Sequence, residues 1–146
     1  MKKVLVTRRL LKSNEERILK IWDAKLNYKD KIYSENKLIE LSKDCDGILS
    51  SVVDNINENV INKISDKVKI ISNFAVGFGN IDIKAAAKKN IIVTNTPDVL
   101  TDATAEIAIL LILGSCRRAF EGIKWVRKKN WKWSADFLIG KQLSES

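Results

Sequence analysis

Short apolar runs alternate with segments of helical spacing from the start of this chain to Thr94. The apolar runs, which predict β-strands, are Val4–Val6, Ala24–Tyr28, Gly47–Ser51, Val68–Ser72 and Ile91–Thr94. The segments between them predict helices, of which the first begins at the cap residue Ser13 and the others are Glu35–Ser42, Glu58–Ile64 and Ile83–Lys89. Such alternation is typical of βαβ units with parallel strands. We therefore expect an α/β fold with a parallel sheet and helices on both of its faces.

The chain changes character after Pro97. Residues 101–129 predict one continuous helix, about 40 Å long at about 1.5 Å per residue, whose apolar side chains cover nearly the whole circumference between Ile107 and Gly114. We expect a helix of this kind to be buried on several sides. An irregular aromatic arm follows at residues 130–140, and we expect it to dock on a partner or on a further domain. The predicted division is therefore 1–100 and 101–146.

The composition excludes several classes of protein. The 146 residues are 45% hydrophobic and 30% charged, which suits a globular domain rather than a disordered segment. No apolar run reaches membrane-spanning length, so no membrane partner is expected. The sequence has no histidine, and its two cysteines, Cys45 and Cys116, lie far apart. A zinc finger, a disulfide framework and histidine-based catalysis within this chain are therefore excluded.

The net charge of +8 suggests nucleic-acid binding, but its distribution weakens that interpretation. Twenty of the 26 basic residues are lysine, whereas base and phosphate recognition favours arginine. The excess lies mostly in residues 117–146, so we expect a solvated basic face and no nucleic-acid partner. Arg8 and Arg9 mimic a twin-arginine export signal, but the polar run Ser13–Arg17 follows them. We therefore expect no targeting segment and a cytoplasmic location.

The loop Phe74–Asp82, between a predicted strand and a predicted helix, is the most informative stretch for function. Its two glycines suggest a dinucleotide fingerprint, but Asp82 occupies the third glycine position of G-x-G-x-x-G and would repel a pyrophosphate. The adjacent backbone N–H groups of Val76 and Gly77 instead predict a nest for a small carboxylate or oxyanion. The alternative is a plain strand-to-helix turn capped by Asn80 or Asp82, and spacing alone favours this alternative.

Other candidates have simpler structural interpretations. Polar residues in Thr94–Glu106 lie where a strand end meets a helix start, a usual place for ligand contact. Three of these polar residues, Asp98, Thr101 and Asp102, are also of the types that ordinarily cap a helix or lie in its acidic first turn. Asp54 is more readily explained as a turn residue than as a catalyst. Cys45 and Cys116 are expected to be small buried residues, since no neighbouring group in the sequence would lower a thiol pKa.

Three segments together closely resemble the D-isomer-specific 2-hydroxyacid dehydrogenase family, in particular its glyoxylate/hydroxypyruvate reductase branch: Asn73–Asp82, Val93–Glu106 and Arg117–Arg118. The opening Val4–Arg9 is also similar to that branch, and the resemblance spans essentially the whole chain. It implies a flavodoxin-like substrate-binding domain, followed by a long connecting helix that leads into a nucleotide-binding domain. It also implies an oxidoreductase that transfers hydride from NADH or NADPH to a small 2-keto acid.

The resemblance also implies roles for individual residues. The N–H groups of Val76 and Gly77 would bind the substrate carboxylate, and Val52 would lie near the substrate. Thr104 would lie at the nicotinamide side of a cleft between domains. A homodimer is implied through the 101–129 helix and the 130–140 arm, with Trp133 and Phe137 contacting the other subunit.

The sequence departs from the family pattern in ways that matter for activity. The catalytic His, Glu and Arg and the G-x-G-x-x-G fingerprint cannot be placed here, so no catalytic residue and no metal ligand is predicted. We therefore expect a fragment, a truncated reading frame or a domain expressed by itself, which is inactive alone. The competing hypothesis is a non-enzymatic module that binds a small carboxylate or mediates dimerisation.

Overall fold

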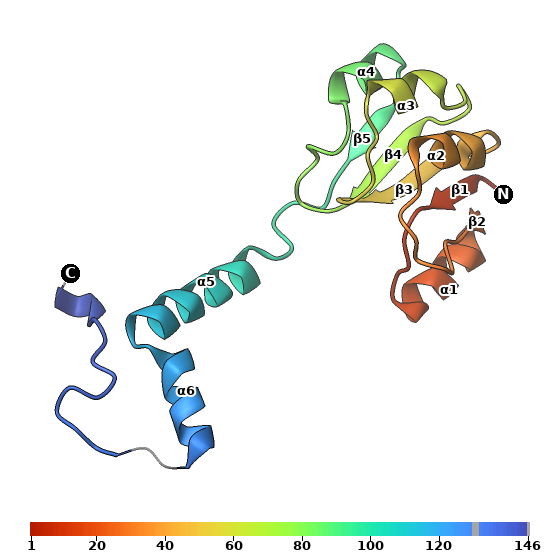
Figure 1. Cartoon of the computed structure of the whole chain (residues 1–146). Helices are drawn as coiled ribbons and strands as arrows, with labels where there is room; N and C mark the ends of the chain where they lie inside the picture. Colours follow the sequence, from red (N-terminus) through yellow and green to blue (C-terminus); the bar gives the residue numbers. More distant parts are fainter. Residues whose placement is uncertain (130–131, 146) are drawn as a thin grey trace. The chain divides into compact units, whose positions relative to one another are not determined.

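The computed structural model describes residues 1–129 and 132–145, and it divides into two compact units, Met1–Val99 and Leu100–Ser146 (Figure 1). The first unit is a parallel five-stranded sheet in the order β2-β1-β3-β4-β5. Its strands are β1 Lys3–Val6, β2 Asp23–Lys25, β3 Gly47–Ser51, β4 Ile70–Phe74 and β5 Ile92–Thr94. Every pairing is parallel, so the strands end together at one edge of the sheet.

Helices cover both faces of this sheet (Figure 1). The bounds of the four helices are α1 Lys12–Ile21, α2 Glu35–Ser42, α3 Glu58–Lys63 and α4 Ile83–Lys88. Helix α1 lies on one face, and the other three lie on the opposite face. The α/β fold, with a parallel sheet and helices on both faces, is thus confirmed.

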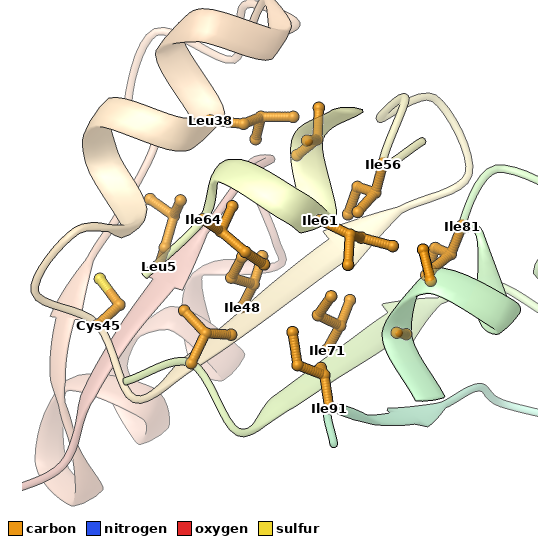
Figure 2. Packing of buried hydrophobic residues seen from close by; sticks show 14 residues of the cluster. Leu5, Leu38, Cys45, Ile48, Ile56, Ile61, Ile64, Ile71, Ile81 and Ile91 are labelled. Atoms are coloured by element: carbon orange, nitrogen blue, oxygen red, sulfur yellow. The ribbon is translucent and has the colours of Figure 1, made fainter. Parts of the chain in front are cut away.

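The core fills the space between the sheet and helices α2, α3 and α4 (Figure 2). Leu5, Ile48 and Ile71 are paired across three neighbouring strands and present one buried row. Leu38 of α2 and Ile61 of α3 pack over that row. Burying a large aliphatic side chain contributes about 1.5–3 kcal/mol to the stability of the fold. The packing of Leu38 and Ile61 on this row therefore fixes the position of the strand ends.

Strand β2 ends at Lys25, three residues before the predicted end at Tyr28. Two further boundary differences have local reasons. Helix α1 begins after Leu11 rather than Ser13, and its N-cap makes no side-chain hydrogen bond. The N–H groups of Asn14 and Glu15 donate to the Leu11 carbonyl at 2.8 and 3.1 Å, and the Glu15 carboxylate accepts from the Leu10 N–H just before the helix at 3.0 Å. Strand β4 begins at Ile70, two residues later than predicted, because Val68 closes a turn through its N–H to Ser65.

The second unit contains two α-helices, α5 Thr101–Cys116 and α6 Ala119–Lys128, where the sequence predicts one continuous helix, and a short 3₁₀ helix at Leu143–Glu145. The helix ends because the Cys116 carbonyl accepts a hydrogen bond from the N–H of Lys141 at 2.7 Å, and Arg118 adopts a left-handed conformation with φ 52°. The ring of Phe120 then packs against Gly114, where a Cβ would lie 3.3 Å from it. Among the described residues, no helix has both the length and the apolar character needed to cross a bilayer.

Gly140 determines how the segment after α6 packs in this unit. A Cβ built there would lie 2.4 Å from the Cys116 carbonyl oxygen and 3.0 Å from the Arg117 Cα. We expect Gly140→Ala to release this segment from the α5–α6 junction at a cost of about 1–3 kcal/mol. The loss of nuclear Overhauser contacts between the Trp125 and Phe137 rings, whose centroids lie 5.7 Å apart, measures this release.

Gly122→Ala is the matched control for that substitution. A Cβ at Gly122 meets only the Leu138 Cδ1, at an ordinary 3.6 Å, and alanine favours the helix that holds it. The ring contacts should therefore persist in this variant. If the contacts between the Trp125 and Phe137 rings also persisted in Gly140→Ala, the close approach of residue 140 to the α5–α6 junction would not be needed to hold this segment in place.

Candidate functional site

Two loops lie side by side at the carboxyl edge of the sheet, one after β3 and one after β4. A parallel bridge joins Ile56 of the first to Ile81 of the second, with the Ile56 N–H donating to the Asn80 carbonyl at 2.9 Å. Ligands of open α/β sheets bind at this edge. The second loop contains Val76 and Gly77, and the first contains Val52, so the three predicted substrate contacts lie on adjacent loops.

Three successive carbonyl groups of the second loop are held by hydrogen bonds from the protein. The Ala75 carbonyl accepts from the Thr96 N–H at 2.9 Å. The Val76 carbonyl accepts from Asn95 Nδ2 at 2.7 Å, and the Gly77 carbonyl accepts from Asn73 Nδ2 at 2.8 Å. The loop is therefore anchored through its acceptors.

The N–H groups of Val76 and Gly77 belong to the same peptides as the Ala75 and Val76 carbonyls. In a trans peptide the N–H points opposite to the carbonyl of the preceding residue, so anchoring the Ala75 and Val76 carbonyls turns the Val76 and Gly77 N–H groups away from their anchors. Within the described part of the chain, neither N–H donates to a protein acceptor, and both residues are exposed. Two adjacent free donors suit one carboxylate.

The loop presents its two adjacent N–H groups without any residue in the left-handed conformation. No residue from Phe74 to Asp82 has a positive φ. The plain-turn alternative is correct in one respect, because the Asp82 carboxylate caps α4 by accepting from the Ala85 N–H at 2.9 Å. The capped turn and the free donors are therefore compatible features of one loop.

The side-chain amides of Asn73 and Asn80 connect the two loops. Asn73 is 2% exposed; its Nδ2 donates to Asn80 Oδ1 at 3.0 Å, and its Oδ1 accepts from Ser50 Oγ at 3.0 Å. Asn80 Nδ2 donates across to the carbonyls of Ser51 and Asp54 at 3.0 and 3.1 Å. Buried polar groups with these partners hold the loops in one arrangement.

Asp54 is a fully buried turn residue, as its simpler interpretation predicts. Its Oδ2 accepts from Thr7 Oγ1 at 2.5 Å and from the Ser51 N–H at 2.8 Å. Its Oδ1 is buried and has no hydrogen-bond partner among the described residues. The carboxylate thus ties the end of β1 to the loop that carries Val52, whose side chain is 60% exposed.

The loop does not fit a dinucleotide. The Asp82 carboxylate occupies the N-terminus of α4, where a pyrophosphate would be expected. The stretch Ala75–Asn80 contains no charged side chain and no acid or base. It can bind and orient a small anion, and proton or hydride transfer would require other groups.

The remaining predicted residues lie elsewhere. Thr104 lies on α5, in the second compact unit, and its side chain is exposed. Trp133 is 80% exposed, whereas Phe137 is half-buried edge-on against Trp125. The N-cap of α5 is Leu100 and makes no side-chain hydrogen bond, so the interpretation of the neighbouring polar residues as side-chain caps is wrong. Asp102 does lie in the first turn as an acidic residue, as predicted.

The two cysteines differ in burial. Cys45 is fully buried, as predicted, and burial raises the pKa of its thiol. Cys116 is only partly buried. In the described ranges 1–129 and 132–145, no group of three or more His, Cys, Asp or Glu could hold a metal ion.

A protein-family model, "D-isomer specific 2-hydroxyacid dehydrogenase, catalytic domain", matches residues 4–137. The chain belongs to this family. A glyoxylate reductase from Korarchaeum cryptofilum is 36% identical over 140 residues, covering 94% of this chain and 42% of that protein. A glycerate dehydrogenase from Hyphomicrobium methylovorum is 36% identical over 143 residues, covering 97% and 44%. The chain thus spans less than half the length of these relatives.

A solved structure of the same family has a similar fold. The protein from Polaromonas sp. JS6 66, described as a D-isomer specific 2-hydroxyacid dehydrogenase, NAD-binding, superposes with a TM-score of 0.84 at 32% identity. The match covers 98% of this chain and 45% of that chain. Family membership therefore applies to both compact units.

Proposed function

We propose that this chain is the substrate-binding part of an NAD(P)-dependent oxidoreductase that reduces a small 2-keto acid to the D-2-hydroxy acid. The observation that carries the proposal is the pair of free, adjacent N–H groups of Val76 and Gly77 at the carboxyl edge of the sheet. Glyoxylate or hydroxypyruvate is the proposed substrate, and the glyoxylate reductase and glycerate dehydrogenase names of the relatives support this choice.

The residues of this chain would bind and orient the substrate. The N–H groups of Val76 and Gly77 would donate to the carboxylate, and Val52 would offer an apolar contact beside it. Hydrogen bonds to a charged acceptor are stronger than neutral ones. Positioning of this kind lowers the entropic barrier to a later hydride transfer.

We propose that NADH or NADPH binds mainly through the part of the relatives' length that this chain does not match. The loop Phe74–Asp82 does not fit a dinucleotide, so no step of the hydride transfer is assigned to residues of this chain. Thr104 is the one residue proposed to approach the nicotinamide. The free thiols of Cys45 and Cys116 fit a reducing compartment such as the cytoplasm.

A homodimer through residues 101–129 and 130–140 is proposed as the assembled form. Five apolar side chains of α5 are each more than half exposed: Ile107, Ile109, Leu110, Leu111 and Ile112. A contiguous apolar surface of this kind favours a protein interface. Trp133 and Phe137 are proposed to contact the other subunit, although part of the segment, residues 130 and 131, lies outside the described residues.

A non-enzymatic carboxylate-binding module is the second candidate function. It is favoured by the absence of acid and base groups from Ala75–Asn80 and of histidine from the whole sequence. Carboxylate binding alone does not separate the two candidates, because both need the same loop.

A chimeric enzyme separates them. We expect the 146-residue chain alone to give no glyoxylate-dependent oxidation of NADH or NADPH. Replacing the matching 42% of the Korarchaeum glyoxylate reductase with this chain should give an enzyme that oxidises reduced nicotinamide when glyoxylate is added. The same chimera with Gly77→Pro should lose that activity.

A folded chimera without activity, next to an active Korarchaeum enzyme, would contradict the oxidoreductase proposal. Turnover by the 146-residue chain alone would contradict its dependence on other residues.

A further inference from the structure

The peptide between Val76 and Gly77 is the part of the loop that most needs external support. A glycine populates positive and negative φ about equally well. A rotation of this peptide plane would reverse the Gly77 N–H with little movement of the flanking chain. A Cβ at Gly77 would meet nothing within 4 Å, so no neighbouring group packs against that side of the residue.

Asn95 supplies that support from a different part of the chain. Its Nδ2 donates to the Val76 carbonyl at 2.7 Å, although 19 residues separate them in the sequence. The next residue, Thr96, donates its backbone N–H to the Ala75 carbonyl at 2.9 Å. These bonds continue the contact between β4 and β5 beyond their last paired residues, Ser72 and Thr94.

We propose that Asn95 is a positioning residue, which holds the Val76 carbonyl so that the Gly77 N–H faces the substrate carboxylate. This inference rests on the proposed function, since it assigns a purpose to the same pair of donors. Asn73 acts in the same way on the following peptide through the Gly77 carbonyl. Asn95 is the better residue to test, because Asn73 is also buried in the network that joins the two loops.

The test measures oxalate binding to the full 146-residue chain by ¹H–¹⁵N correlation spectroscopy, with oxalate as an unreactive two-carbon carboxylate. We expect Asn95→Ala to weaken oxalate binding about tenfold, the equivalent of one net hydrogen bond of about 1–1.5 kcal/mol. Asn95→Asp should weaken it at least as much, because a carboxylate cannot donate to the Val76 carbonyl. Asn14→Ala, at an exposed asparagine of α1, is the matched control and should bind like the unmodified chain.

A second readout separates positioning from general stability. Without oxalate, the orientation of the Gly77 N–H, measured by residual dipolar coupling, should change in Asn95→Ala while the melting temperature stays the same. A merely structural role would lower the melting temperature and disturb amides throughout the sheet.

The outcomes distinguish the two proposals. Weaker binding with a reoriented Gly77 N–H supports the inference. Binding by the unmodified chain that is unchanged in Asn95→Ala would overturn the inference and leave the proposed function intact. No binding by the unmodified chain would overturn the carboxylate site, and the positioning role with it.

Discussion

Substitution of Gly77 by proline is expected to weaken oxalate binding by the chain about 10- to 100-fold. Proline has no backbone N–H, so the variant removes one of the two donors without removing a side chain. A hydrogen bond to a charged acceptor contributes about 1.5–3 kcal/mol, which corresponds to this loss. The dissociation constant, measured by the same ¹H–¹⁵N titration, gives the effect directly.

Gly77→Ala is the matched control for that prediction. Alanine keeps the N–H, its Cβ enters open space, and the φ of Gly77 lies outside the left-handed region. Binding should therefore change by no more than about twofold, as for a neutral surface substitution. Equal binding by the proline and alanine variants would show that the Gly77 N–H does not contact the anion.

Truncation of Ile61 to alanine is expected to have the largest effect on stability. Its side chain is fully buried between α3 and the row of Ile48 and Ile71 (Figure 2). Loss of its methyl and methylene groups leaves a cavity under the strand ends, and such substitutions cost about 2–5 kcal/mol. Urea denaturation followed by far-ultraviolet circular dichroism measures the change in the free energy of unfolding.

Ile32→Ala makes the same chemical change at a side chain that is 60% exposed, in a segment without helix or strand. Its effect should stay within about 0.5 kcal/mol. If the two variants had equal free energies of unfolding, Ile61 would not belong to a packed core.

The strands and helices of the first unit could be predicted because their signals are local. Gly47–Ser51 and Glu35–Ser42 have the predicted bounds, since a buried strand and an amphipathic helix show in their own residues. The interrupted helix could not be predicted in this way. Neither Arg117 nor Arg118 disfavours a helix, and the break depends on Lys141, which is more than 20 residues away.

The two N–H donors of the candidate site could be predicted from the sequence, but the side chains that hold their peptides in place could not. The position of Val76 and Gly77 after a strand identifies the loop as a candidate carboxylate site. The roles of Asn73 and Asn95 depend on which carbonyl each side chain meets across neighbouring strands, and no spacing in the sequence reports that. Asparagine at the end of a predicted strand was the available signal, although turns also favour this residue.

Titration of the unmodified 146-residue chain with oxalate, followed residue by residue in ¹H–¹⁵N spectra, tests the central claim most directly. The account predicts saturable downfield shifts of the Val76 and Gly77 amide protons, because both form hydrogen bonds to the anion. Shifts confined to the basic residues of α6, or the absence of any shift at Val76 and Gly77, would contradict it.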